Sequence, residues 1–205
     1  MRRSVGFDLD MTLVDSRRGI RAALLALAAE TARPIDAESI VAALGPPIGE
    51  ALAPWFSPDE LPDAVQRFRA HMAEVGVVDV SPLPGAAESA RAVRAAGYDV
   101  VVITSKIAPL ALATLANAGI EADHVVGNVW AEGKAAPLVE RQALCYVGDH
   151  PGDMIAAVTA GVPGFGVTSG SSTTAALRAA GATEVAASLE AFPPWLSRIA
   201  PAGAI

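Results

Sequence analysis

The sequence predicts an α/β fold in which a doubly wound parallel sheet carries a small all-α insertion after its first strand. Three observations lead to this fold class. Short apolar runs alternate with helical stretches of about ten residues, as in βαβ units. Residues 16–78 interrupt this alternation because they show only helical periodicity. The 205 residues are 52% hydrophobic, so the chain can bury a substantial core.

The expected strands are short and rich in β-branched residues. Residues 4–10 form an apolar run almost at the start of the chain, and residues 98–103 are bounded by Gly97 and Thr104. The remaining expected strands are 125–126, 144–147, 164–167 and, more weakly, 184–186. Helices are expected between them over residues 85–96, 108–118, 151–160, 173–180 and 189–199.

The insertion is divided by turns that contain proline. These turns are Arg33-Pro34, Gly45-Pro46-Pro47 and Ser57-Pro58, so we expect four short helices. We therefore expect an α/β core domain formed by residues 1–14 and 83–205, and an α-helical cap domain formed by residues 15–82.

Composition excludes several classes of protein. The net charge of −7 argues against a nucleic-acid binder, which needs a basic surface for phosphates. The single cysteine, Cys145, excludes a disulfide framework and a CxxC zinc site. The longest uncharged run, residues 154–177, is broken by Pro163 and several glycines, so we expect no membrane span. We expect a soluble, cytoplasmic protein, either a monomer or a homodimer.

Acidic residues gather at the expected carboxyl ends of strands, where open parallel sheets bind ligands. Asp8 and Asp10 are two residues apart and share one face of the first strand. Asp149 and Asp153 follow the strand at 144–147. Clustered carboxylates need a compensating cation, and oxygen ligands without histidine or cysteine suit Mg²⁺. Such an ion would let an anionic phosphate approach.

Hydroxyl and ammonium groups lie at the same expected edge or beside it. Thr104 ends the strand at 98–103 and could hold phosphoryl oxygens, while Lys134 could supply a point charge. Lys106 and Lys134 are the only lysines in a chain that otherwise uses arginine. This choice is consistent with sites that need a compact ammonium group.

These motifs resemble those of the haloacid dehalogenase (HAD) superfamily. Residues 7–16, FDLDMTLVDS, resemble its DxDxT nucleophile motif. Thr104, Lys134 and residues 148–153 (GDHPGD) resemble its second, third and fourth motifs, in order. The helical insertion, residues 44–48 (LGPPI) and residues 104–106 (TSK) are similar to the phosphoglycolate phosphatase-like branch. The resemblance covers essentially the whole chain and implies a Rossmann-like core.

The resemblance also implies a role for each matched residue. Asp8 would attack phosphorus to form an aspartyl-phosphate intermediate, and Asp10 would act as general acid and then as general base. The implied Mg²⁺ ligands are Asp8, Asp10 (through its backbone carbonyl), Asp149 and Asp153. The residues expected to bind the phosphoryl group are Thr104, Ser105 and Lys134. Lys106 is either a substrate contact or a solvated residue at a helix start.

The sequence departs from the family pattern at three places. Met11 stands where relatives usually carry glycine, Ala135 replaces a common proline, and the segment 134–149 is short for this branch.

The expected reaction is hydrolysis of a small phosphorylated metabolite, such as phosphoglycolate, a sugar phosphate or a nucleotide. Dehalogenases of the superfamily lack a carboxylate at the position of Asp10, which favours phosphoryl transfer here. A phosphomutase and a non-catalytic scaffold that binds a phospho-ligand remain alternatives. A signalling receiver domain ranks last because it lacks a helical insertion of this size.

Overall fold

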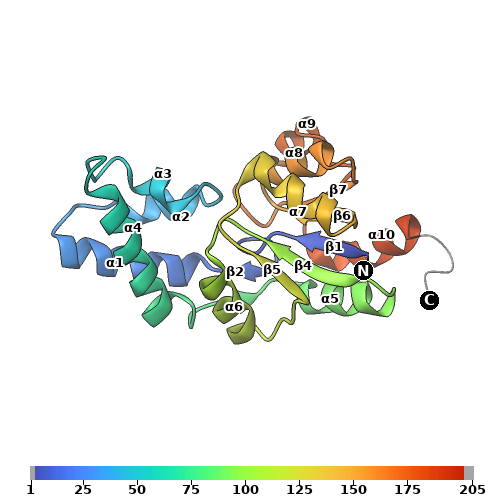
Figure 1. The fold of residues 1–205 in the computed structure, drawn as a ribbon, viewed down its shortest axis with the longest axis horizontal. Coiled ribbons are helices and arrows are strands. Elements are labelled where there is room, and N and C mark those ends of the chain that lie inside the picture. Colours follow the sequence, from blue (N-terminus) through green and yellow to red (C-terminus); the bar gives the residue numbers. More distant parts are fainter. Residues whose placement is uncertain (1–2, 201–205) are drawn as a thin grey trace.

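The computed structural model describes residues 3–200 and contains a six-stranded parallel sheet (Figure 1). Its strands are β1 (Ser4–Phe7), β4 (Asp99–Ile103), β5 (His124–Val126), β6 (Ala143–Gly148), β7 (Gly164–Val167) and β8 (Glu184–Ala186). Their order is β5-β4-β1-β6-β7-β8, and every neighbouring pair is parallel. This arrangement confirms the predicted α/β class with a doubly wound, Rossmann-like sheet.

The chain reverses its direction of travel across the sheet at β1. It proceeds from β1 to β4 and β5 on one side, and then returns to β6 on the other side of β1. The carboxyl ends of β4, β1 and β6 therefore lie next to one another, with the topological switch point between β1 and β6. Ligands of such sheets bind at this position.

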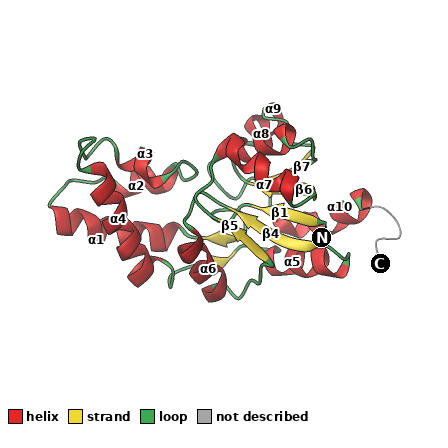
Figure 2. Ribbon diagram, in the orientation of Figure 1, coloured by secondary structure: helices red, strands yellow, loops and turns green. Residues whose placement is uncertain are grey.

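Helices cover both faces of the sheet (Figure 2). They are α5 (Ala86–Ala95), α6 (Ala108–Asn117), α7 (Ala135–Glu140), α8 (Pro151–Thr159), α9 (Thr174–Ala179) and α10 (Phe192–Ile199). Val100 and Val102 belong to the apolar cluster that includes α5 and α10 residues, whereas Val101 and Ile103 join the cluster of α7 and α8. Because alternate residues of β4 are buried on opposite faces, the whole strand reads as one apolar run.

A separate group of helices follows the first strand and lies to one side of the sheet in Figure 1. It comprises α1 (Arg17–Thr31), α2 (Ala37–Ala42), α3 (Ile48–Leu52) and α4 (Leu61–His71), which continues as a π-helical turn (Met72–Gly76). These elements, residues 17–76, are called the helical unit below. The unit is centred on a second apolar cluster, which includes Leu24, Leu52 and Phe68 and which Leu110 of α6 joins. The four predicted helices are thus present.

Two short strands join the helical unit to the sheet. β2 (Val14–Asp15) pairs antiparallel with β3 (Ser81–Pro82), so the outgoing and returning chains lie side by side. The proposed domain boundaries at residues 15 and 82 fall in this ribbon and stay a prediction. Within residues 3–200, no helix is long and apolar enough to cross a membrane.

Candidate active site

The strand order brings the sequence-predicted residues to one edge of the sheet. Asp8 follows β1, Thr104 follows β4 and Asp149 follows β6. Asp153 lies in the first turn of α8, directly after β6. Parallel strands end at the same edge, so side chains that are far apart in the sequence share one site.

Three carboxylates form a buried acidic cluster. Asp8, Asp149 and Asp153 each offer an oxygen atom, and these atoms all lie within 4.8 Å of one another. Thr12 Oγ1 donates a hydrogen bond of 2.9 Å to Asp149, and the His150 backbone N–H donates one of 3.1 Å to Asp153. Buried, oxygen-only ligands held by neighbouring groups fit a hard divalent cation.

Lys134 is the buried counter-charge of this cluster. Its Nζ lies 2.8 Å from Asp8 Oδ1 and 2.7 Å from Asp153 Oδ1, and its side chain is 1% exposed. Burial alone lowers the pKa of Lys134, but the charges of Asp153 and Asp8 outweigh this effect and hold the pKa well above its usual value. Lys134 is therefore a fixed positive charge beside Asp8.

Burial dominates the acid–base behaviour of the carboxylates. It raises the pKa of Asp8 to about 7, although the neighbouring Lys134 charge acts in the opposite direction. Burial, together with the charges of Asp8 and Asp153, also raises the pKa of Asp149 well above its usual value. A bound cation would favour the ionised forms of both groups.

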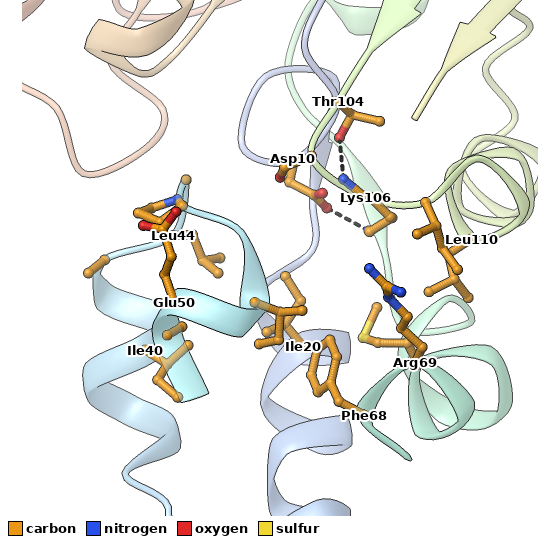
Figure 3. Close-up of a pocket in the computed structure, with 18 of the residues that line it drawn as sticks. Asp10, Ile20, Ile40, Leu44, Glu50, Phe68, Arg69, Thr104, Lys106 and Leu110 are labelled. Atoms are coloured by element: carbon orange, nitrogen blue, oxygen red, sulfur yellow. Dashed lines mark hydrogen bonds and ion pairs between the residues drawn. The ribbon is translucent and has the colours of Figure 1, made fainter. Parts of the chain in front are cut away.

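The side chain of Asp10 is not part of the acidic cluster. It faces Lys106 instead (Figure 3). Lys106 Nζ is 2.7 Å from Asp10 Oδ1, and Thr104 Oγ1 accepts a hydrogen bond of 3.2 Å from the Lys106 backbone N–H. Because the Lys106 side chain is only 8% exposed, its interpretation as a solvated helix-start residue is wrong. The structure places it in the site.

The nucleophile loop contains an unusual backbone conformation. Met11 has a φ of 61°, a left-handed value that glycine adopts more readily than other residues. This explains why the related motif usually has glycine here. The Met11 carbonyl accepts a hydrogen bond of 2.5 Å from Ser169 Oγ, and its N–H donates one of 2.8 Å to the Val14 carbonyl. These two hydrogen bonds hold the loop in this left-handed conformation although Met11, unlike glycine, carries a side chain.

A pocket of about 450 Å³ lies between the sheet edge and the helical unit. The core contributes Asp8, Asp10, Thr104, Ser105, Lys106, Ile107 and Leu110 to its lining. Arg69 in α4 and Trp55 also line the pocket, although the sequence analysis above assigns neither of them to the site. No spacing in the sequence distinguishes these residues from the other side chains of the helical unit.

Gly45 of the helical unit lies close to His150, in the loop that follows β6. A Cβ at Gly45 would lie 2.8 Å from His150 Cδ2 and 3.2 Å from Trp130 Cη2. Gly45 also has a φ of 145°, so both the lack of space for a side chain and the backbone conformation favour glycine at this position. The sequence analysis did not anticipate this contact between residues 44–48 and the loop after β6.

Comparison with known proteins agrees with this geometry. Residues 5–167 match the family model of the haloacid dehalogenase-like hydrolases. The chain belongs to this family. Among relatives of this HAD-like hydrolase, the probable phosphatase IndB of Dickeya dadantii is 32% identical, with 88% of this chain and 87% of that protein covered. A phosphoglycolate phosphatase of Rhodospirillum rubrum is 33% identical, with 80% and 78% covered.

The fold is also found in solved structures. A haloacid dehalogenase-like hydrolase from Streptococcus pneumoniae superposes with a TM-score of 0.81 at 23% identity, covering 95% of this chain and 98% of that one. This likeness shows the fold, and the match to the family model over residues 5–167 confirms the family predicted from the four motifs.

Proposed function

We propose that this HAD-like hydrolase is a Mg²⁺-dependent phosphatase that hydrolyses a small phosphate monoester through a phosphorylated Asp8. The observation that carries this proposal is the position of Asp8. Its carboxylate belongs to the acidic cluster, pairs with Lys134 at 2.8 Å and lines the pocket. The names of the two relatives, a probable phosphatase and a phosphoglycolate phosphatase, support the same reaction.

The cation would be held by the carboxylates of Asp8, Asp149 and Asp153 and by the backbone carbonyl of Asp10. When bound, Mg²⁺ neutralises negative charge on the carboxylates and the phosphate and orients the phosphoryl group. The donor set fits this ion because it offers only oxygen ligands from buried side chains.

In the first chemical step, a carboxylate oxygen of Asp8 attacks phosphorus and the bond from phosphorus to the leaving oxygen breaks. Asp10 donates a proton to that oxygen, so the product leaves as an alcohol. Thr104, Ser105 and Lys134 hold the phosphoryl oxygens as charge develops on them. Lys106, at 2.7 Å from Asp10, holds the Asp10 carboxylate in position.

In the second step, a water molecule attacks the phosphorus of phospho-Asp8, and Asp10 accepts the proton of that water. The bond between phosphorus and the Asp8 oxygen breaks, which releases inorganic phosphate and restores the carboxylate. The helical unit acts as a cap that covers the pocket and excludes bulk water during these steps. We propose that the cap domain comprises residues 15–82, which contain the helical unit.

The test is phosphate release from a panel that includes phosphoglycolate, sugar phosphates and p-nitrophenyl phosphate, with Mg²⁺ and with a chelator. We expect release that requires Mg²⁺ and is lost in Asp8→Asn, while thermal unfolding shows that this variant is folded. Product analysis with a sugar bisphosphate activator distinguishes a phosphomutase. Mg²⁺ binding without turnover of any ester would contradict the phosphatase and favour a binding scaffold.

A further inference from the structure

The pocket extends from the catalytic edge into the helical unit. The carboxylate of Asp10 and the Lys106 ammonium lie at its core end, and apolar side chains of the helical unit lie at the other (Figure 3). The apolar lining from the helical unit includes Ile20 in α1, Ile40 in α2, Ile48 and Ala51 in α3, Phe68 in α4, and Met72. This part of the pocket is called the apolar chamber below.

The apolar chamber is built mainly by one structural unit. Ile20, Ile40 and Phe68 come from three different helices that pack together in a single cluster. Each is less than 9% exposed and still lines the pocket. Ile107 and Leu110 of the core line the same pocket, which lies between the sheet edge and the helical unit. The chamber is therefore the part of that pocket whose apolar lining comes from the helical unit, and these lining residues keep their relative positions if the unit moves as a rigid body.

The chamber offers few polar groups. Within the described residues, the charged side chains that the helical unit contributes to the pocket lining are Glu50 and Arg69. Arg69 could pair with the carboxylate of a two-carbon acid such as phosphoglycolate. That small leaving group would leave most of the apolar wall in contact with water. Apolar walls bind apolar ligand surface because burial removes both from water.

We propose that the substrate is a phosphate monoester whose alcohol has a bulky apolar body, held in the apolar chamber, rather than the ester of a two-carbon acid. This inference rests on the phosphatase function proposed above and names the leaving group of the same site. The phosphoryl group lies at Asp8, and the apolar body extends past Lys106 between Ile40 and Phe68.

The test compares ethyl, butyl and hexyl phosphate with phosphoglycolate as substrates of the Mg²⁺-loaded native protein. The three alkyl esters release primary alcohols of similar acidity, so differences in kcat/KM report recognition of the chain. Each buried methylene favours binding by about 0.8 kcal/mol, or roughly fourfold. We expect kcat/KM to rise on the order of a hundredfold from ethyl to hexyl phosphate, and hexyl phosphate to exceed phosphoglycolate.

A pair of matched variants locates this gain. Ala51 lines the chamber from α3, whereas Ala53, at the end of the same helix, is exposed and is not part of the pocket lining. Ala51→Phe fills the chamber and should reduce the hexyl-to-ethyl ratio of kcat/KM to less than about tenfold. Ala53→Phe introduces the same side chain outside the pocket and should keep the native ratio.

The failures of the two proposals are distinguishable. Turnover of all esters with no increase along the alkyl series, or with phosphoglycolate as the best substrate, overturns the apolar leaving group and leaves the phosphatase intact. If no ester is hydrolysed, calorimetry with ethyl- and hexylphosphonate still decides. Hexylphosphonate that binds at least tenfold more tightly supports the chamber as a ligand site, and equal affinities overturn it.

Discussion

The ammonium group of Lys134 lies 2.8 Å from a carboxylate oxygen of Asp8, a residue 126 positions away in the sequence. The same group lies 2.7 Å from Asp153 at the start of α8. The buried ammonium group of Lys134 thus links the end of β1 to the first turn of α8. Lys134 takes this place although Ala135 and the short following segment depart from the family pattern. Lys134 is the last residue of the 3₁₀ turn Ala131–Lys134 and directly precedes helix α7, and these two elements position its side chain.

Loss of Lys134 should destabilise the fold as well as the reaction. Lys134→Met leaves the buried carboxylates of Asp8 and Asp153 without their counter-charge, which typically costs about 3–5 kcal/mol. Urea unfolding with a chelator at about pH 8 measures this change. The exposed pair of Arg91 and Glu88 provides the control, because Arg91→Met should cost less than about 1 kcal/mol. A similar small loss for both variants would contradict the assigned role of Lys134.

The raised pKa of Asp8 predicts how stability depends on pH. Its pKa is about 7 in the folded, metal-free protein, against an ordinary value of 3.8. Between these values the folded protein retains a proton that the unfolded chain has released. The contribution of Asp8 to the free energy of unfolding therefore falls as pH rises from about 4 to about 7.

Urea unfolding of the native protein and of Asp8→Asn, each with a chelator, measures this contribution. It is the difference between the free energies of unfolding of the two proteins. Mg²⁺ competes with the proton, so its apparent affinity should increase over the same pH range. If, without Mg²⁺, the free energy of unfolding of the native protein increased relative to that of Asp8→Asn as pH rises, Asp8 would not be desolvated.

Gly170 tests the placement of Asp149. A Cβ at this position would overlap Oδ2 of Asp149, so Gly170→Ala must displace the carboxylate or the loop. Changes that move a metal ligand typically reduce affinity by about 10–100-fold. We expect this loss in Mg²⁺ titrations followed by thermal unfolding. Ser171→Ala, an exposed neighbour, should bind Mg²⁺ like the native protein. Native affinity in Gly170→Ala would argue against Asp149 as a ligand.

Lys106 should affect turnover without affecting the metal. Its Nζ lies 2.7 Å from Asp10, whereas the acidic cluster comprises other carboxylates. Lys106→Met removes the group that positions the proposed general acid, so kcat should fall by about 10–100-fold. The Mg²⁺-induced rise in the midpoint of thermal unfolding should stay the same. An unchanged kcat would exclude a positioning role for Lys106.

The sequence was sufficient to predict the sheet and the edge at which the candidate site residues lie. Asp8, Thr104 and Asp149 each end an apolar run, and strand ends meet in a parallel sheet whatever the details of packing. The weak strand at 184–186 is also present as β8. In contrast, the six-residue helix α7 was not anticipated.

The substrate end of the pocket could not be predicted in the same way. Phe68 and Arg69 are neighbours on α4, and nothing in their spacing shows that both line a pocket. Their position depends on how α4 packs against α1 and α3, which is a property of the assembled unit. The contact of Gly45 with His150 likewise joins two segments that only the folded chain brings together.

The central claim is that Asp8 carries the phosphoryl group during turnover. The most direct measurement is mass spectrometry of peptides from the Mg²⁺-loaded protein, acid-quenched during turnover of p-nitrophenyl phosphate. We predict that one phosphoryl group is found on the peptide containing Asp8, at the Asp8 carboxylate, and that it is absent from Asp8→Asn. Steady turnover with no phosphoryl group on that peptide, or with the group on another residue, would contradict the account.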